Sequence, residues 1–355
     1  MKVTVLVGGV GGARFLQGAR ERFGATPFPA RDADTVGPHS VTAVVNVGDD
    51  AWMHGVRICP DLDTCMYTLG GGIDLERGWG RTGETWHAKE ELAAYGADPD
   101  WFGLGDRDLA THLIRTQMLA SGYPLSDVTA ALCNRWQPGV RLLPASDTRH
   151  ETHVVISDEA AGDGASEATG DGLRKRAIHF EEWWVRYRAD VPTFGFVQVG
   201  TGQGDSDGVH AAGAGRAQAG PGVLEAIAEA DVVFLAPSNP VVSVGAILSV
   251  GGIRAALRTT SAKVVGVSPV IGGAPLRGMA DRCLEVIGLQ TSAQAVGEYY
   301  GPRSGTGLLD GWLVAEEDAS VAVEGLPVAA VPLLMTTPTH TAAMIDAGLA
   351  LVGLA

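Results

Sequence analysis

Cysteine, long apolar runs and basic clusters are all scarce in this sequence. Its 355 residues include four cysteines, and no two of them have C-x-x-C spacing: Cys59, Cys65, Cys133 and Cys283. So few cysteines do not build a disulfide framework, and we therefore expect a reducing compartment, the cytoplasm. No apolar run approaches the length that spans a bilayer, so we expect no membrane association.

The charge balance is acidic. The chain has 26 lysines and arginines against 41 aspartates and glutamates, a formal net charge of −15. This charge repels a phosphate backbone, and no basic run is long enough to overcome it, so we expect no nucleic-acid partner. A small phosphorylated ligand needs only local amides, arginines or a metal ion. With 46% apolar residues, the chain fits one large α/β domain with an insertion, or two smaller domains.

A valine-rich run followed by carboxylates is the most informative stretch. Val44–Val47 predicts a buried parallel strand, and four carboxylates follow it: Asp49, Asp50, Asp61 and Asp63. Ligands of open α/β sheets bind beyond the carboxyl ends of strands, and clustered carboxylates need a compensating cation. We predict Mg²⁺, which prefers oxygen ligands. A solvated acidic loop, with Asp61 and Asp63 as simple helix caps, is the alternative.

A glycine-rich loop follows the first predicted strand. The β-branched run Lys2–Val7 leads into Gly8, Gly9, Gly11 and Gly12 and then into a helix-like stretch. Backbone N–H groups of such a loop approach phosphates closely, and the helix N-terminus adds partial positive charge. The loop is no Walker A motif, and Arg14 stands where G-x-G-x-x-G has its third glycine. Both departures disfavour an ATPase and a nicotinamide oxidoreductase. A turn that only packs helix on strand is the alternative.

Strand and helix patterns alternate through the rest of the chain. Apolar runs at 231–236, 263–267 and 328–334 are each followed by small polar residues and a helix-like stretch. This alternation predicts an α/β fold with a doubly wound, Rossmann-like parallel sheet.

Three successive helical patterns predict an inserted helical lobe at 75–138, placed over the strand ends where it would shield the pocket from water. The Rossmann-like domain is then divided into 1–74 and 139–355. Apolar runs at 152–156 and 177–180 predict two further strands. Two segments rich in small and polar residues, 157–175, which joins these strands, and 201–220, are expected to be flexible loops.

Six short motifs occur in order along nearly the whole chain: Gly8–Gly12, Asn46–Asp50, Pro60–Thr64, Gly105–Asp108, Leu235–Pro240 and Ser268–Pro269. Together they resemble the CofD family of phospholactate transferases. Residues 52–55 and 277–281 are most similar to the actinobacterial branch, which helps to build the deazaflavin coenzyme F420. Each motif alone is weak, whereas six in order are specific.

The resemblance implies transfer of a phosphoenolpyruvyl group from enolpyruvyl-diphospho-guanosine to the ribityl hydroxyl of the deazaflavin Fo. The products are dehydro-F420-0 and GMP, and archaeal relatives use the lactyl analogue. Phosphoryl transfer to an alcohol needs neutralisation of the diphosphate and a carboxylate that orients or deprotonates the hydroxyl.

The resemblance also assigns residues. It implies that Asp50 and Lys89 contact Fo. Asp49, Asp61 and Asp63 are the candidate catalytic residues, with Asp49 and Asp61 as magnesium ligands. The proposed contacts to guanosine diphosphate are Gly8, Gly9, Gly11, Gly12, Ser238, Asn239 and Ser268.

Two questions stay open. A non-catalytic, nucleotide-sugar-binding regulator is the alternative function, because some relatives share the glycine loop and the Pro-Ser-Asn-Pro turn. The acidic segment Pro60–Thr64 and Lys89 in the helical lobe favour the transferase. Either an enolpyruvyl or a lactyl donor fits the residues, and we expect a homodimer that acts on small molecules.

Overall fold

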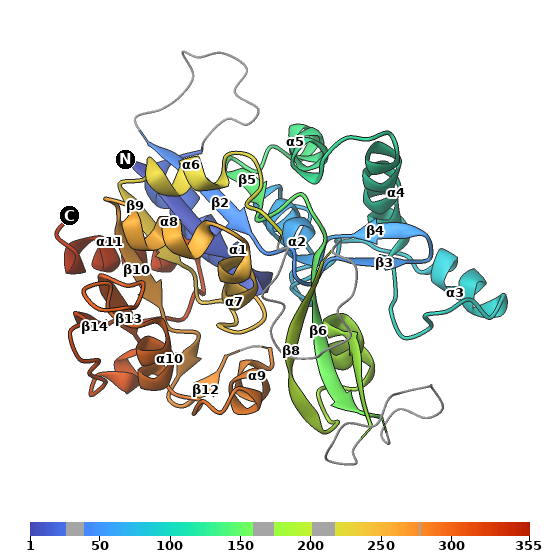
Figure 1. Ribbon diagram of the computed structural model, residues 1–355. Helices are drawn as coiled ribbons and strands as arrows, with labels where there is room; N and C mark the ends of the chain where they lie inside the picture. The colour runs from blue at the N-terminus through green and yellow to red at the C-terminus, as the bar shows by residue number, and fades with distance from the viewer. Residues whose placement is uncertain (26–38, 159–173, 201–216, 277) are drawn as a thin grey trace.

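A parallel sheet of seven strands forms the centre of the computed structural model, in the order β14-β13-β10-β9-β1-β2-β5 (Figure 1). The structure describes residues 1–25, 39–158, 174–200, 217–276 and 278–355. The strands of this sheet are β1 (Lys2–Val7), β2 (Ser40–Val45), β5 (Arg141–Pro144), β9 (Val232–Leu235), β10 (Lys263–Val267), β13 (Gly311–Val314) and β14 (Val328–Ala330).

The central strands are the valine-rich runs of the sequence. Strands β1, β2, β9 and β10 are buried along almost their whole length. A strand covered by helices on both faces has no exposed side, so its sequence is a continuous apolar run rather than an alternating one. The predicted strand at 328–334 is shorter than expected, and β5 and β13 are additional strands that the sequence patterns do not predict.

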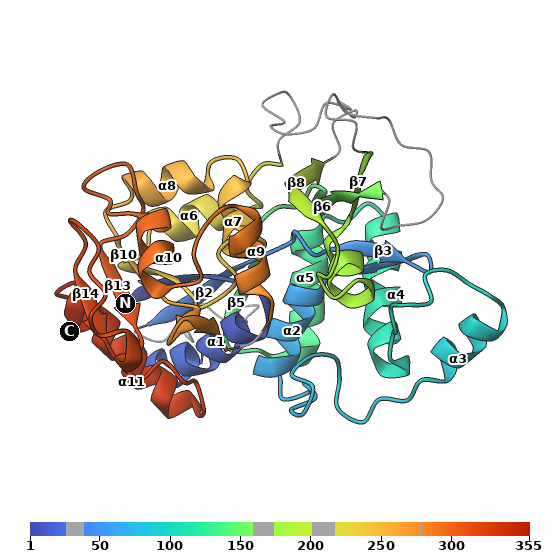
Figure 2. The same cartoon turned by 90° about the horizontal axis from the view of Figure 1, so that it is seen from below.

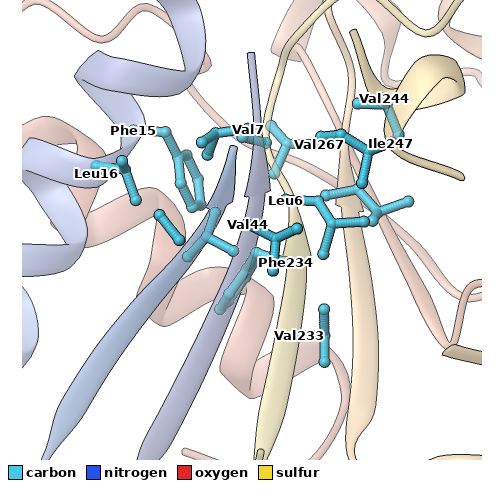
Figure 3. Close-up of a cluster of buried hydrophobic side chains, with 14 of the residues drawn as sticks. Leu6, Val7, Phe15, Leu16, Val44, Val233, Phe234, Val244, Ile247 and Val267 are labelled. Carbon is cyan, nitrogen blue, oxygen red and sulfur yellow. The ribbon is translucent and has the colours of Figure 1, made fainter. Parts of the chain in front are cut away.

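Helices cover both faces of the sheet (Figure 2). On one face α1 (Gly9–Phe23) packs against α2 (Pro60–Leu69) and α11 (Pro338–Leu351). On the other face α6 (Val223–Ala228) and α7 (Val244–Ser249) pack against α8 (Ile253–Thr259). Figure 3 shows Phe15 and Leu16 of α1 on one side of the strands and Val244 and Ile247 of α7 on the other. The ring centroids of Phe15 and Phe234 are 5.5 Å apart. The predicted doubly wound, Rossmann-like fold is confirmed.

The helices around the sheet have the following bounds: α1 (Gly9–Phe23), α2 (Pro60–Leu69), α5 (Leu125–Trp136), α6 (Val223–Ala228), α7 (Val244–Ser249), α8 (Ile253–Thr259), α9 (Ala280–Val286), α10 (Ala293–Tyr300) and α11 (Pro338–Leu351). Within the described ranges, no helix combines the length and the apolar character needed to cross a bilayer.

The helices of the predicted lobe divide into two groups. α3 (His87–Ala94) and α4 (Asp106–Ala120) lie on the side of the hairpin β3 (Ala51–Met53) and β4 (Val56–Ile58), away from the main sheet (Figure 1). α5 packs on β5 instead, and its buried Leu125 and Cys133 belong to the main core. The segment 75–138 therefore contributes one helix to the core as well as two helices beyond it.

Carboxylates from neighbouring segments cap both outer helices. The Asp106 carboxylate accepts hydrogen bonds from the backbone N–H groups of His87 and Ala88, at 3.1 and 2.9 Å, and so caps α3. The Glu84 carboxylate accepts from the N–H groups of Arg107 and Asp108, each at 2.8 Å, and so caps α4. Both helices thus have otherwise unpaired N–H groups satisfied by a carboxylate from the neighbouring segment.

A second, antiparallel sheet lies within the segment 139–355, and two of its strands match the strands predicted at 152–156 and 177–180. It has the order β7-β6-β8, from β6 (His150–Ser157), β7 (Lys175–His179) and β8 (Thr193–Gly200). A π-helical turn, Glu182–Arg186, follows β7, and Trp183 in it is buried against Ile156 and Phe180. A small hairpin, β11 (Val270–Ile271) and β12 (Ala274–Pro275), completes the list of strands. The loops expected to be flexible, 157–175 and 201–220, lie mostly outside the described residues.

Candidate active site

The strand order reverses between β1 and β9, and the loops that follow these two strands meet there. The Ser238 hydroxyl donates a hydrogen bond to the Gly8 carbonyl at 2.7 Å and accepts one from the Gly8 N–H at 3.1 Å. A reversal of strand order is where open α/β sheets bind ligands. The structure therefore brings together the glycine loop and Ser238, two parts of the predicted nucleotide site.

Two of the loop glycines have a packing role. A Cβ atom at Gly11 would lie 2.7 Å from the Pro237 carbonyl oxygen, and one at Gly12 would lie 2.8 Å from the Val7 Cβ. Both distances are shorter than real Cβ contacts. Gly11 and Gly12 are thus required for the close approach of α1 to the loops around it, whatever binds beside them.

Gly11→Ala is expected to lower the free energy of unfolding by about 1–3 kcal/mol, the usual effect of overpacking. The added methyl group has to push the Pro237 carbonyl away. Thermal unfolding measures the effect. Gly195→Ala is the matched control, because a Cβ at Gly195 meets no atom within 4 Å. Equal stability of Gly11→Ala and the wild type would contradict the packing role.

Asp61 holds the glycine loop from α2. Its carboxylate accepts a hydrogen bond from the Gly9 N–H at 2.7 Å and another from Asn46 Nδ2 at 2.9 Å. Gly9 is the first residue of α1, so Asp61 satisfies one of the N–H groups that a helix leaves unpaired at its start. Burial raises the pKa of Asp61 to about 6, although both hydrogen bonds lower it. Gly9 therefore already has an anionic partner within the protein.

Asp49 lies among other carboxylates. It is 8% exposed, and within the part of the chain that the structure describes, its buried Oδ1 has no hydrogen-bond partner. Burial raises the pKa of Asp49 well above its usual value, and the charges of Asp61, Glu181 and Asp50 raise it further. Buried like charges of this kind are stabilised by a divalent cation, and carboxylate oxygens are the ligands that Mg²⁺ prefers. Asp49 and Asp61 fit the predicted metal site.

Glu181 is the member of this group that sequence reasoning missed. It follows β7, is half-buried, and has its pKa raised to about 8 by burial and by the charge of Asp61. No recognisable motif surrounds it in the sequence, and its neighbours Trp183 and Trp184 suggest packing. Only the antiparallel sheet, which the patterns did not predict as a separate unit, brings it to the edge of the main sheet.

Asp63 faces a different partner from Asp61. Two positions along an α-helix differ by roughly 200° around its axis, so the two side chains leave α2 in nearly opposite directions. Asp63 forms a buried ion pair with Arg115 of α4, and its Oδ2 lies 3.7 Å from His112 Nδ1. Arg115 also donates to the Arg57 carbonyl at 3.3 Å. Asp63 thus joins α2 to α4 instead of facing the glycine loop.

A second group of possible metal ligands includes Asp63. Ligand atoms of Asp63, Asp108 and His112 all lie within 4.8 Å of one another. The hydroxyl of Tyr67 donates to Asp108 at 2.6 Å. Burial raises the pKa of Asp63, but Arg115 and His112 lower it. The Arg115 guanidinium offsets one of the two carboxylate charges of this group, and Asp63 Oδ2 and His112 Nε2 have no hydrogen-bond partner among the described residues.

Asp50 is buried beneath the edge of the sheet. It is 0% exposed, and its Oδ2 lies 3.4 Å from Arg57 Nη2, while Arg57 Nη1 donates to Glu151 at 2.7 Å. Burial raises the pKa of Asp50 to about 7, against the lowering effect of Arg57. The carboxylate predicted to contact Fo therefore faces the protein interior in this structure.

A cavity of about 250 Å³ lies beside strand β3, which follows Asp50. It is lined by Ala51, Trp52, Met53, Pro99, Trp101, Arg149, Glu151, His153 and His179. Trp52 is 56% exposed, which is unusual for a tryptophan and leaves its ring open to the cavity. The cavity combines apolar rings with charged and hydrogen-bonding groups, as ligand pockets do.

Lys89 lines a different and much smaller cavity, of about 30 Å³, with His54 and Phe102 among its neighbours. The side chain is exposed, and its Nζ lies 5.8 Å from the centroid of the Trp86 ring. Pro99 lines both cavities. The structure therefore places Lys89 near the larger cavity but not in its wall.

Asn239 and Ser268, the other predicted nucleotide contacts, shape their own loops. Asn239 Oδ1 accepts from the Val241 N–H at 2.9 Å. The Ser268 hydroxyl donates to the Val270 carbonyl at 2.8 Å and accepts from the Val270 N–H at 3.1 Å. Ser268 follows β10, so both residues lie at the edge of the sheet where Ser238 lies.

Known proteins agree with this architecture. The family model described as 2-phospho-L-lactate transferase CofD matches residues 3–326. A phosphoenolpyruvate transferase of Mycolicibacterium smegmatis is 65% identical over 353 residues, 99% of each chain. A protein of the same name from Nocardia farcinica is 62% identical and covers 99% of this chain and 95% of its own. A crystal structure of a UPF0052-family protein from Bacillus halodurans has the same fold, with a TM-score of 0.53, 17% identity, and coverage of 98% of this chain and 99% of that one. The chain therefore belongs to the CofD family of transferases.

Proposed function

We propose that this transferase moves a phosphoenolpyruvyl or phospholactyl group from a guanosine-diphosphate-activated donor to the ribityl hydroxyl of Fo. The relatives named phosphoenolpyruvate transferase support the identity of the transferred group. The observation that carries the proposal is the pair of buried carboxylates of Asp49 and Asp61 beside the glycine loop. Asp61 bonds to Gly9 on one side, and Asp49 is two residues from Ala51 in the cavity wall.

The donor side uses the loops after β1, β9 and β10. The N–H groups at the start of α1 and the small residues Ser238 and Asn239 let a diphosphate approach the backbone. Asp49 and Asp61 would hold Mg²⁺, which neutralises diphosphate charge as the leaving GMP forms. Asp61 keeps the glycine loop in position through Gly9, and a carboxylate of this group orients or deprotonates the attacking hydroxyl.

The acceptor side uses the 250 Å³ cavity. Trp52 and Trp101 offer flat apolar surfaces to the deazaflavin rings, and Arg149 and His153 offer hydrogen bonds to its polar edge. Asp50 supports this wall from beneath through its ion pair with Arg57. The ribityl chain would then extend toward Asp49.

Mass spectrometry of the product tests the proposal directly. Incubation with Fo, Mg²⁺ and either donor is expected to give dehydro-F420-0 from the enolpyruvyl donor or F420-0 from the lactyl donor, together with GMP. The two products differ by two hydrogens, so the spectrum also identifies the preferred donor. Binding of guanosine diphosphate without any product would favour the non-catalytic regulator.

Lys89→Ala is expected to weaken Fo binding about tenfold or more, the usual effect of losing a charge-assisted hydrogen bond. Guanosine diphosphate affinity should not change, because Lys89 lies on α3, beyond the hairpin β3–β4. Calorimetry with each ligand measures both affinities. Lys2→Ala is the control, since Lys2 lies at the amino end of β1, opposite the carboxyl ends of the strands, and pairs with Glu229 at 2.8 Å. Unchanged Fo affinity in Lys89→Ala would mean that Lys89 is a solvent-exposed residue with no role in Fo binding.

We also propose a cytoplasmic location, as the cysteine content of the sequence suggests. The four cysteines are free and buried, which suits a reducing cytoplasm. The homodimer stays a prediction.

A further inference from the structure

We propose that Arg149 makes the acceptor cavity selective for an ionised ring, by binding the phenolate oxygen of the deazaflavin Fo. This inference deepens the proposed function and rests on it, because it takes Fo as the ligand of the 250 Å³ cavity. The phenolic hydroxyl of Fo is conjugated through its rings to a carbonyl group, so it loses its proton more readily than an ordinary phenol, whose pKa is about 10. A cation in the cavity wall can therefore discriminate between the neutral and the ionised ring.

Glu151 holds the Arg149 guanidinium in the cavity wall. Arg149 Nη2 donates a hydrogen bond to Glu151 Oε2 at 2.7 Å, and Arg57 Nη1 donates to Glu151 Oε1, also at 2.7 Å. Glu151 and Arg57 are buried, whereas 45% of the Arg149 side chain is exposed. Arg57 thus fixes Glu151 from the interior, and Glu151 in turn fixes Arg149 where a ligand can reach it.

This part of the wall carries surplus positive charge, although the chain as a whole is acidic. The two guanidiniums share the single carboxylate of Glu151. Burial raises the pKa of this carboxyl group, but contacts with His153, Arg149 and Arg57 outweigh burial and hold the pKa well below its usual value. Glu151 therefore stays ionised, and its one negative charge offsets only one of the two cations.

The other ionisable groups nearby do not cancel this surplus. His179 is neutral at neutral pH, because burial lowers its pKa to about 4. His153, with Nε2 3.6 Å from Glu151 Oε2, can only be neutral or positive. Asp50 lies behind Arg57, with 3.4 Å between Oδ2 and Nη2, and burial raises the pKa of Asp50 to about 7, so its negative charge is incomplete at neutral pH. An anionic ligand group is thus favoured in this cavity.

Hydrogen-bond chemistry selects the edge of the ring that meets Arg149. A guanidinium has five N–H donors and no acceptor, and among the described residues Arg149 uses its Nη2 for Glu151. A phenolate oxygen only accepts hydrogen bonds and so complements these donors. The pyrimidinedione edge of Fo instead places an N–H donor between two carbonyl groups, and a guanidinium cannot accept from it. The hydroxyl-bearing edge therefore fits Arg149, while Trp52 and Trp101 line the same cavity.

A pH titration of the Fo absorbance spectrum, free and bound to the purified full-length protein, tests the inference, because ionisation of the hydroxyl changes the spectrum of the ring. A nearby opposite charge lowers the pKa of an acid by about 1–3, so Fo bound to the wild type is expected to ionise about one pH unit or more below free Fo. Arg149→Met should abolish this difference, and Arg149→Lys, which keeps the charge, should retain part of it. Arg22→Met is the matched control, since Arg22 lies on α1 in a surface pair with Asp346.

Calorimetry with riboflavin gives a second readout. Riboflavin has the same ribityl chain and pyrimidinedione edge, but a methyl group in place of the phenolic hydroxyl. At about pH 8, Arg149→Met is expected to weaken Fo binding about tenfold or more, the usual effect of losing a charge-assisted hydrogen bond, and to change riboflavin binding little. The Tm of Arg149→Met should stay near that of the wild type, because Glu151 keeps its hydrogen bond from Arg57.

Equal losses of Fo and riboflavin affinity in Arg149→Met would overturn the inference, as would the same ionisation of free Fo and of Fo bound to the wild type. If the wild type then still forms dehydro-F420-0 or F420-0, the role of Arg149 is rejected and the proposed function is retained. A difference in ionisation that depends on Arg149, in a wild type that forms no product from either donor, would retain the recognition of the ionised ring and reject the transfer reaction.

Discussion

Asp49→Asn is expected to reduce turnover about a hundredfold or more while the protein stays folded. The substitution preserves the size of the side chain but removes the charge of the buried carboxylate whose Oδ1 has no other partner. In the proposed reaction this carboxylate helps to hold Mg²⁺ beside the diphosphate. Its loss therefore removes stabilisation of the negative charge in the transition state of phosphoryl transfer. Single-turnover kinetics with saturating Mg²⁺ measures the effect.

Stability separates this role from a structural one. Burial and three neighbouring carboxylates already raise the pKa of Asp49, so a neutral amide at this position relieves repulsion. The variant should therefore unfold at a temperature no lower than the wild type. Asp346→Asn, on α11 in a surface pair with Arg22, is the control with the same chemical change and should retain full activity. Full turnover by Asp49→Asn, or by the wild type in EDTA, would contradict the metal proposal.

The sequence was sufficient to predict the centre of the fold because the central strands are continuous apolar runs. Strands β1, β2, β9 and β10 have many buried valines and are followed by glycine or small polar residues, two signals that agree. Strands β5 and β13 have four residues each, too few for a periodic pattern. Their positions depend on pairing with β2 and β10, which is tertiary information.

The antiparallel sheet was predicted only in part, for a related reason. The runs at 152–156 and 177–180 indicate β6 and β7, but nothing in the sequence indicated β8 or the pairing of the three strands. Strand β6 pairs with β7 and β8 across segments that lie largely outside the described residues, and these connections have no hairpin signature such as Asn-Gly. Glu181 was missed with it. A residue that reaches a site only through a distant sheet has no local motif that indicates its role.

The sequence predicted where the candidate site lies, but not which of its carboxylates faces the glycine loop and which forms an ion pair with Arg115. Asp49 and Asp61 are both at the edge of the main sheet, as expected from a strand that ends at Gly48. The different surroundings of Asp61 and Asp63 depend on α4, which lies about fifty residues later in the chain. Helical geometry predicts that the two side chains diverge, but only the position of Arg115 decides which one is balanced by a cation.

Arg115→Met is expected to lower the free energy of unfolding by about 3–5 kcal/mol, the usual effect of removing one partner of a buried ion pair. Arg115 is 1% exposed and pairs with Asp63 between α2 and α4. Without the guanidinium, Asp63 is left buried beside Asp108, another carboxylate, with only His112 to offset its charge. Chemical denaturation measures the change.

Activity per folded molecule then decides the role of Asp63. If Asp63 is structural, Arg115→Met should keep most of its turnover below its unfolding temperature, and replacing both partners by apolar residues, Arg115→Met with Asp63→Leu, should recover much of the lost stability. Arg107→Met is the control on the same helix, because Arg107 is exposed and its loss should change stability by about 0.5 kcal/mol or less. An Asp63→Asn variant with wild-type stability and no turnover would instead make Asp63 a catalytic residue, and the Asp63, Asp108 and His112 group would then be the metal site to test.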